Sequence, residues 1–501
     1  MNIAQKLKIG ERFATVFKRF PAAFAFLGVL VIAAFAWGAN TSNEEKLIPT
    51  LWYCFTAAFL SVAMKLIREE KPGIAAEIVL QAALLGFWAY CCLLGYFNGA
   101  SQTAMGSISV LVFIACFINS FYKERNDVPL VNFTIRMVVV LAATGIVTLI
   151  FMLAIFLIMS ALNMLFKINV TNYAYFMAAV ISWALLFPTM LLQFVPEGQA
   201  KHDYSTNLGK FVKGVTKWLV LPVTAAYLVI LYVYTIKILV TWTLPNGWVA
   251  IPVSVSFALC LLLLFLLYPE AYSENEKPLS AAVRRWIPVA MLPLLALMSV
   301  GIFKRIGDYG ATVERLYLLA FNLWCYGICL GLIFSRGKRF WWIPASFALV
   351  FLLTSVGPWN FTSTTRRIIQ KDARNIMMEN GITKFPADSS TFSSMMSKAD
   401  SATTERLIDK LTYLEWNYRE DTTAIRDLVD YNVDIYDKYD IYPYDVDSVV
   451  TLPDTASFKD VRIEQAKDSV IFRIPHPTYY QDTLLLAVPR EELKKLYEAV
   501  Q

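Results

Sequence analysis

Long apolar runs, separated by short polar connections, make up the first 357 residues of the chain. A helix needs about 20 mostly apolar residues to cross the hydrocarbon core of a bilayer, which is about 30 Å thick. Helices are the expected form, because backbone polar groups must be satisfied inside lipid and the period-two alternation of a barrel strand is missing. The pattern predicts eleven spans, at about 21–38, 47–67, 74–97, 103–121, 132–163, 173–194, 215–240, 248–268, 287–305, 312–334 and 340–357.

The fifth run is longer than a bilayer requires. From Asn132 to Phe166 the chain is apolar apart from Arg136. A helix of this length, roughly 35 residues, extends for about 50 Å. We therefore expect it to tilt, kink or protrude from the membrane.

Lys and Arg are distributed unevenly between the two sets of connections. The N-terminal tail and the connections near residues 65–71, 123–125, 201–217, 277–285 and 336–339 hold 20 of them, and the alternate connections hold four. Basic connections stay on the cytoplasmic side. We therefore predict a basic cytoplasmic segment at 1–20, a membrane domain at 21–357 in the cytoplasmic (inner) membrane, and an outer domain at 358–501. Ala36-Trp37-Gly38 leaves cleavage of the first span as a signal peptide an open alternative.

Composition supports this division of the chain. Hydrophobic residues make up 57% and charged residues 17%, which excludes soluble, disordered, collagen-like and disulfide-rich secreted proteins. Residues 1–357 hold 27 basic and 15 acidic side chains, whereas residues 358–501 hold 18 and 24. The basic excess therefore belongs to loops beside a membrane and does not indicate a nucleic-acid partner. All seven cysteines lie in apolar runs, where packing is the expected role.

The acidic domain is expected to have an α+β fold. Helices are predicted at 362–380, 403–418 and 422–431, with a Ser-rich link at 388–400. Strands are predicted at 448–452, 459–464, 469–474 and 483–488, followed by a charged helix. The segment 430–447 is rich in Tyr and Asp, which leaves three alternatives: a calcium site, a face for carbohydrate or protein, and a plain polar loop.

Few ionisable residues fall within the spans, and such residues are functional candidates. Glu77 and Arg136 lie at similar depth near the inner side, which leaves two alternatives: an ion pair between them, or side chains that each reach the interface. No nucleotide, zinc or hydrolase motif occurs, and the two histidines have no metal-ligand partner at useful spacing. We expect no cofactor, no metal and no catalytic residue.

The connection before the tenth span is the most distinctive patch. Gly310 permits a turn, Thr312 is suited to cap the following helix, and Glu314 favours the helix dipole. The alternatives are a well-capped helix start and an outer site for an anion or lipid headgroup. The candidate binding residues of this patch are Arg305, Asp308, Tyr309, Gly310, Thr312, Glu314 and Arg315.

The motif Tyr309-Gly310-x-Thr312-x-x-Arg315, followed by an aromatic-rich span and Pro358-Trp359-Asn360, resembles a bacterial membrane-protein family catalogued as domain of unknown function 4153. The resemblance covers most of residues 1–380 in layout. It implies a bacterial multi-pass inner-membrane protein. It implies no established activity and so supplies no catalytic residues.

Three function classes remain. An envelope scaffold or sensor, whose outer domain binds a ligand, is favoured because midplane charges and catalytic signatures are missing. The alternatives are a transporter or lipid-handling permease, and a membrane transferase. The expected partners are the lipid bilayer and an envelope protein, a lipid headgroup or a glycan.

Overall fold

The computed structural model describes residues 14–39, 44–69, 73–93, 99–207, 209–241, 249–273, 278–357, 359–418 and 423–430, and three strands nearer the C-terminus. The chain divides into two compact units, Met1–Val433 and Asp434–Gln501. The first unit is helical throughout its described elements, and the strands belong to the second.

Ten helical segments of the described chain are long and apolar enough to cross a membrane. They coincide with the first ten predicted spans, and a helical membrane protein is therefore confirmed at this level. Their elements are α2 (Pro21–Ala39), α3 (Glu44–Arg68), α4 (Ala75–Leu93), α5 (Gly99–Ile118), α6 (Val128–Phe166), α7–η2–α8 (Asn172–Gln193), α9–η4–α10 (Lys210–Thr241), α11–η5 (Ala250–Tyr272), α12 (Pro278–Tyr309) and α13 (Val313–Ser335).

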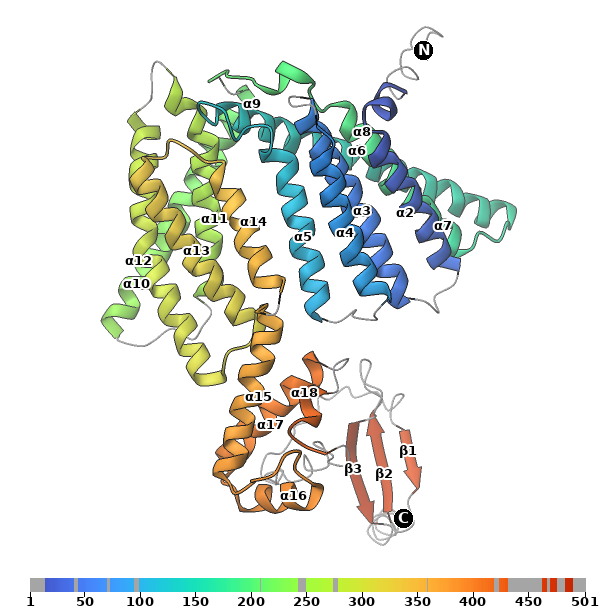
Figure 1. The fold of residues 1–501 in the computed structure, drawn as a ribbon, viewed down its shortest axis with the longest axis vertical. Helices are drawn as coiled ribbons and strands as arrows, with labels where there is room; N and C mark the ends of the chain where they lie inside the picture. The colour runs from blue at the N-terminus through green and yellow to red at the C-terminus, as the bar shows by residue number, and fades with distance from the viewer. Residues whose placement is uncertain are drawn as a thin grey trace, which may run out of the picture. The chain divides into compact units, whose positions relative to one another are not determined.

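The eleventh predicted span is a shorter helix. Helix α14 (Trp342–Ser355) has 14 residues, or about 21 Å, and does not fill the predicted range 340–357. The chain leaves the helix at Gly357, whose φ of +94° lies in the left-handed region that glycine tolerates best. Helix α14 packs against α5 and α13. It lies between a group of helices that includes α2 to α5 and a group that includes α10 to α13 (Figure 1).

Helix α6 confirms the overlong fifth span. It has 39 residues, which corresponds to about 58 Å, and it ends at Lys167 in the left-handed conformation. Its buried residues all lie between Val128 and Thr148. The rest of the helix reaches out at the side of the bundle (Figure 1), as expected for a helix longer than the bilayer is thick.

Two of the spans contain a π-helical turn, η2 (Ser182–Leu186) and η4 (Thr216–Val220). Each turn ends two residues before a proline, Pro188 or Pro222. Proline lacks a backbone N–H and its ring clashes with the carbonyl four residues earlier. The wider π turn removes this conflict without breaking the span.

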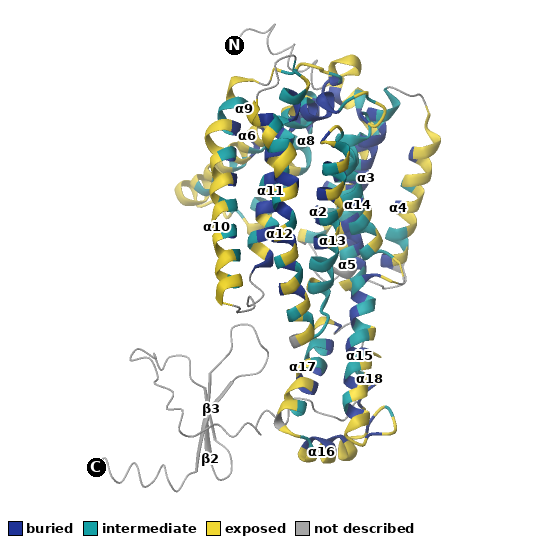
Figure 2. Ribbon diagram, turned by 90° about the vertical axis from the view of Figure 1, so that its left-hand side faces the viewer, coloured by how far each residue is buried: buried dark blue, intermediate teal, exposed yellow. Residues whose placement is uncertain are grey.

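Two large sets of buried side chains hold most of the described membrane helices together, and a smaller set joins α3, α4 and α5. One large set joins α10, α11, α12 and α13, and the other large set joins α2, α3, α5, α6 and α8. The start of α6 belongs to both, since Val128 and Val131 face the first set and Leu130 and Phe133 face the second. Figure 2 shows the corresponding pattern, with buried residues on α3 and α11 and exposed residues along α4 and α10.

Hydrophilic helices follow the bundle within the first unit: α15 (Phe361–Glu379), α16 (Ser389–Lys398), α17 (Ser401–Asn417) and α18 (Thr423–Arg426). The predicted helices at 362–380 and 403–418 are confirmed as α15 and α17. The Ser-rich link expected at 388–400 is wrong, because α16 occupies it. The Asp388 carboxylate caps α16 at the Thr391 N–H, and its Phe392 side chain is buried.

The second unit contains one antiparallel sheet in the order β1-β2-β3. Its strands are β1 (Arg462–Gln465), β2 (Ser469–Ile474) and β3 (Thr483–Pro489). The strands expected at 469–474 and 483–488 match β2 and β3, and the one expected at 459–464 starts later. The strand at 448–452, most of the Tyr/Asp-rich segment and the final helix lie outside the described residues. A separate α+β domain at 358–501 stays a prediction.

Candidate functional site

The predicted patch before the tenth span forms a cavity at the α12–α13 turn. The cavity has a volume of about 220 Å³, and Arg305, Thr312, Glu314 and Arg315 all line it. Thr312 is the N-cap residue of α13, but its side chain makes no capping hydrogen bond. The structure therefore brings four of the seven candidate residues of the patch to one place.

Backbone and neighbouring helices hold this turn. Gly310 has a φ of +80°, and its carbonyl accepts a hydrogen bond of 2.6 Å from Arg315 Nη1. The Val313 N–H donates to the Tyr413 hydroxyl of α17 over 3.3 Å. Burial raises the pKa of Tyr413, and the nearby Glu314 carboxylate adds to this effect. Asp308 and Tyr309 lie in the last turn of α12, and their side chains are outside the described part of the chain.

The two candidates inside the spans are not brought together. Glu77 is buried and forms an ion pair with Arg68, with 2.8 Å between Oε2 and Nη2. Arg136 is exposed on α6. Arg68 thus takes the role that the sequence suggested for Arg136, because it ends the helix that precedes Glu77 in an antiparallel hairpin.

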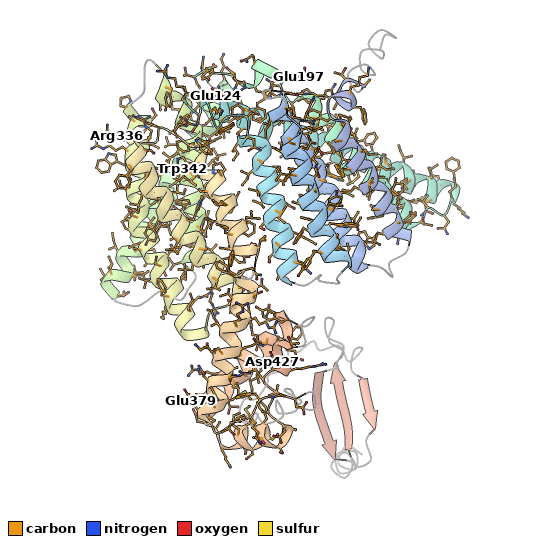
Figure 3. The ribbon with its side chains drawn as sticks, in the orientation of Figure 1. Glu124, Glu197, Arg336, Trp342, Glu379 and Asp427 are labelled. Atoms are coloured by element: carbon orange, nitrogen blue, oxygen red, sulfur yellow. The ribbon has the colours of Figure 1, made fainter. Side chains whose placement is uncertain are left out.

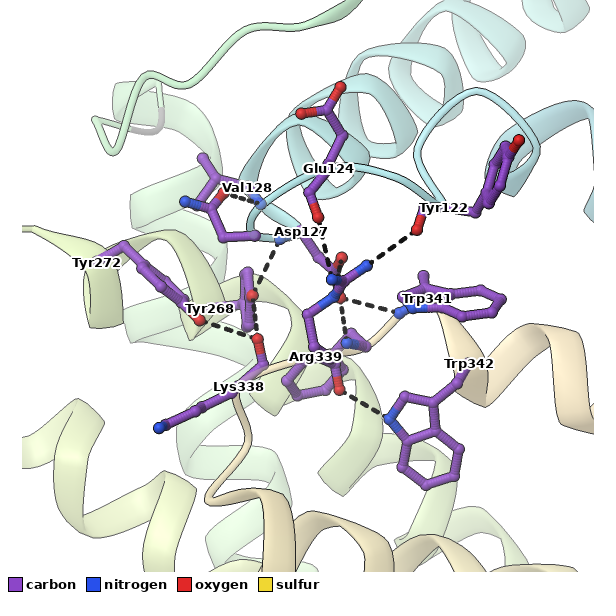
Figure 4. Close-up of polar contacts among 12 residues, drawn as sticks. Tyr122, Glu124, Asp127, Val128, Tyr268, Tyr272, Lys338, Arg339, Trp341 and Trp342 are labelled. Carbon is purple, nitrogen blue, oxygen red and sulfur yellow. Dashed lines mark hydrogen bonds and ion pairs between the residues drawn. The ribbon is translucent and has the colours of Figure 1, made fainter. Parts of the chain in front are cut away.

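A polar network around Asp127, called the Asp127 network below, was not anticipated from the sequence. The Asp127 side chain is fully buried, and its Oδ1 lies 2.9 Å from Arg339 Nε. Its other oxygen accepts hydrogen bonds from the backbone N–H groups of Phe340 and Trp341 (Figure 4). An anion at the start of α14 is favoured by the helix dipole. Asp127, at the start of α6, therefore caps a different helix.

Further hydrogen bonds extend the Asp127 network to η5 and to the loop after α5 (Figure 4). The Tyr268 hydroxyl accepts a hydrogen bond from the Asp127 N–H and donates to the Lys338 carbonyl over 2.7 Å. Arg339 Nη1 donates to the Glu124 carbonyl over 3.0 Å. The Asp127 network joins segments that belong to the two groups of membrane helices.

A second, partly buried cluster joins the residues just before α2 to the segment after α8. Arg19 forms two hydrogen bonds with the Glu69 carboxylate and also donates to the Val195 carbonyl over 2.7 Å. Lys201, with a fully buried side chain, lies 3.1 Å from Glu69 and donates to the Leu66 carbonyl. Burial raises the pKa of Glu69, but the bonds from Arg19 and Lys201 outweigh it and leave the pKa below its ordinary value.

These clusters show that the basic connections meet at one end of the bundle. His202 Nδ1 lies 2.7 Å from a Glu124 oxygen, which adds a further link between the loops. Figure 3 shows Glu124, Glu197 and Arg336 at this end, and Glu379 and Asp427 at the opposite end of the same unit. The sequence signal was present in the acidic residues of these loops, but counting only Lys and Arg overlooked it.

A cavity of about 520 Å³ lies between α2, α3, α5, α6 and the α7–α8 span. Its described lining contains no Asp, Glu, Lys, Arg or His side chain and is rich in aromatic rings. Along α2 it extends from Ala23 to Trp37, a distance of about 21 Å. The π turn η2 forms part of its wall through Trp183 and Ala184. Representative lining residues outside α2 are Leu51, Phe55, Ala58, Phe113, Phe133, Phe187 and Val195.

Comparisons with known proteins assign no activity. The model of a family described as "Domain of unknown function (DUF4153)" matches residues 24–376, which runs from α2 into α15. The chain is 23% identical over 321 residues to "Uncharacterized protein PM1469" of Pasteurella multocida (strain Pm70), covering 64% of this chain. The chain spans about half the length of that relative, 52%. No solved structure matches.

Proposed function

Because the chain belongs to the DUF4153 family, whose description assigns no activity, its function has to be argued from its own geometry, and we propose that it is a lipid-handling membrane protein. The long apolar cavity beside α2 is the observation that carries this proposal. The hydrocarbon tail of a lipid is the ligand class that it suits. Among the functions weighed from the sequence, this favours the lipid-handling permease over the scaffold or sensor.

The chemistry of the lining supports a hydrocarbon ligand. A volume of about 520 Å³ lies within the range of roughly 300–1,000 Å³ that is usual for small-molecule sites. A hydrophilic substrate would need polar partners inside the cavity, because burying an unpaired polar group costs free energy. Apolar and aromatic side chains instead gain by excluding solvent and lose nothing by contact with CH₂ groups.

The dimensions of the cavity support a ligand that lies along the membrane normal. The lining runs for about 21 Å on α2 and reaches both the Leu51 end and the Leu66 end of α3. At the Leu66 and Val195 end it meets the backbone carbonyls that Lys201 and Arg19 hold. A lipid tail aligned with its neighbours in the bilayer suits this shape.

The proposal includes an orientation. We infer that the end carrying Arg19, Lys201 and Arg339 is cytoplasmic and that the protein lies in the inner membrane of a bacterium, with residues 358–501 on the outer side. The clustering of the basic connections at one end supports this orientation, since basic connections are retained in the cytoplasm. A sensor role for the outer residues is compatible with lipid handling in the bundle.

Lipid retention tests the proposal. The protein is purified in a mild detergent, and bound lipids are extracted and quantified by mass spectrometry. Ala58 is buried at the cavity wall, so Ala58→Phe should fill the space and reduce the amount of lipid that co-purifies. In nanodiscs, a phospholipid with a photoactivatable tail should label cavity residues such as Phe55 and Phe187 in the wild type, and much less in Ala58→Phe.

Ala154→Phe is the matched control, because Ala154 is exposed on the outer part of α6. It adds the same ring without entering the cavity and should leave lipid retention unchanged. Size-exclusion profiles and melting temperatures establish that both variants fold. Equal retention and equal labelling in the two folded variants would refute lipid binding in the cavity.

A further inference from the structure

The cavity at the α12–α13 turn differs in chemistry from the apolar cavity and lies among different helices. Two arginines, Arg305 of α12 and Arg315 of α13, line its volume of about 220 Å³. Glu314 is the acidic residue of the lining. The described lining thus carries two guanidinium groups and one carboxylate, which is a net positive charge.

The first turn of α13 adds hydrogen-bond donors to this positive cavity. The first N–H groups of a helix have no partner within the helix. The Thr312 side chain, which also lines the cavity, does not cap them. Within the part of the chain that the structure describes, the Tyr413 hydroxyl accepts a hydrogen bond from the Val313 N–H. Backbone N–H groups and guanidinium groups together are the usual partners of a phosphate oxygen.

The turn is held in place and does not depend on a ligand for its shape. Arg315 bonds the Gly310 carbonyl, which orients one guanidinium group at the cavity wall. Helix α17 contacts the turn through Tyr413, and its Lys410 is anchored by Asp372 at 3.2 Å. A preformed site of this kind loses little entropy when a ligand binds.

The position of the cavity along the bundle matches the level of lipid headgroups. The long apolar run of α12 ends at Phe303, and Lys304 and Arg305 follow immediately. Figure 1 shows α12 and α13 meeting at the end of the bundle next to α15 and α17. Arginines at such a level commonly face the interface between lipid and water.

We propose that the cavity at the α12–α13 turn binds a phosphate group, which Arg305, Arg315 and the first turn of α13 hold together. The group belongs either to a lipid headgroup or to a free phosphate ion, since the chemistry of recognition is shared. Glu314 weakens the site by repelling the anion and thereby keeps binding reversible. This site is separate from the apolar cavity, so either proposal stands if the other fails.

The experiment uses the full chain in nanodiscs and two probes. Inorganic phosphate is titrated into phosphatidylcholine nanodiscs at constant ionic strength, and the melting temperature is followed. In a second arm, retention of phosphatidylglycerol is measured by native mass spectrometry in mixed nanodiscs. A saturable shift with phosphate identifies a free-ion site, and selective retention of phosphatidylglycerol identifies a headgroup site.

Variants distinguish binding in the cavity from a general effect of positive charge. Arg305 is exposed, so Arg305→Gln should fold and should weaken binding of the effective probe by about tenfold. Lys304→Gln removes the same charge one residue away, outside the cavity lining, and should leave binding unchanged. Glu314→Gln should strengthen binding. The proposal is overturned if neither probe binds, if both basic variants weaken binding equally, or if Glu314→Gln weakens it.

Discussion

Removing the Asp127 carboxylate should destabilise the junction between the two groups of membrane helices. In Asp127→Ala, the guanidinium of Arg339 loses its ion pair and the N–H groups of Phe340 and Trp341 lose their acceptor. Residues more than 200 positions apart in the chain would then be held by fewer bonds. The start of α14 would also lose the anion that stabilises its dipole.

The magnitude follows from burial. Breaking a buried ion pair by removing one partner typically costs about 3–5 kcal/mol. The Asp127 side chain is 0% exposed, but that of Arg339 is 31% exposed, so water partly replaces the lost carboxylate there. Two orphaned N–H groups add to the loss at about 1–3 kcal/mol each when buried, although these terms overlap. We expect a total of about 3–5 kcal/mol.

Thermal unfolding in detergent, followed by tryptophan fluorescence, measures the effect. A loss of this size lowers the apparent melting temperature by roughly 5–10 °C. Asp127→Asn keeps the shape and one acceptor oxygen, so its loss should be smaller. Asp409→Ala is the control, since Asp409 is exposed on α17 and should change the melting temperature little.

A double-mutant cycle measures whether Asp127 and Arg339 of the Asp127 network are energetically coupled. Because Arg339→Ala removes the same ion pair, the double variant should be less destabilised than the two single losses added together. Additive losses, or a melting temperature of Asp127→Ala equal to that of Asp409→Ala, would show that the carboxylate does not join these helices as argued.

Two further predictions concern stability. Because the pKa of Glu69 is lowered in the folded protein, the contribution of this carboxylate to stability is complete above the unfolded value of about 4.5 and is lost as the pH falls through the lower folded value. Glu69→Gln should therefore flatten the acid side of a plot of melting temperature against pH. An unchanged profile would contradict the role of Arg19. In Gly331→Ala, the new Cβ would lie 2.6 Å from the Trp342 ring, and the variant should lose about 1–3 kcal/mol of stability. The Cβ added in Gly327→Ala meets nothing within 4 Å, so this variant should be tolerated. Equal denaturation midpoints for the two variants would rule out the contact with Trp342.

Those two glycines illustrate what a local pattern can and cannot predict. The spacing Gly327-x-x-x-Gly331 is typical of close helix contacts in membranes. In the structure only Gly331 makes a close contact, with the ring of Trp342 in α14. The partner of a small residue depends on how helices cross, and that information is not contained in the spacing.

Much of the membrane architecture was determined by the sequence alone. The ten long spans and the overlong α6 follow from the length of apolar runs, because a helix in lipid satisfies its own backbone and needs no distant partner. The strand patterns at 469–474 and 483–488 were also readable as local alternation. The candidate turn at Gly310 and Thr312 was recognised from its own residues for the same reason.

Tertiary structure decided what depends on separate helices meeting. The acceptor for the start of α14 is Asp127, which lies 214 positions before Trp341, and no periodicity connects the two. The apolar cavity requires five helices to splay around a common space, while each of its lining residues alone looks like ordinary packing. Apolar length is a property of one segment, whereas a cavity or a buried ion pair belongs to the arrangement of several.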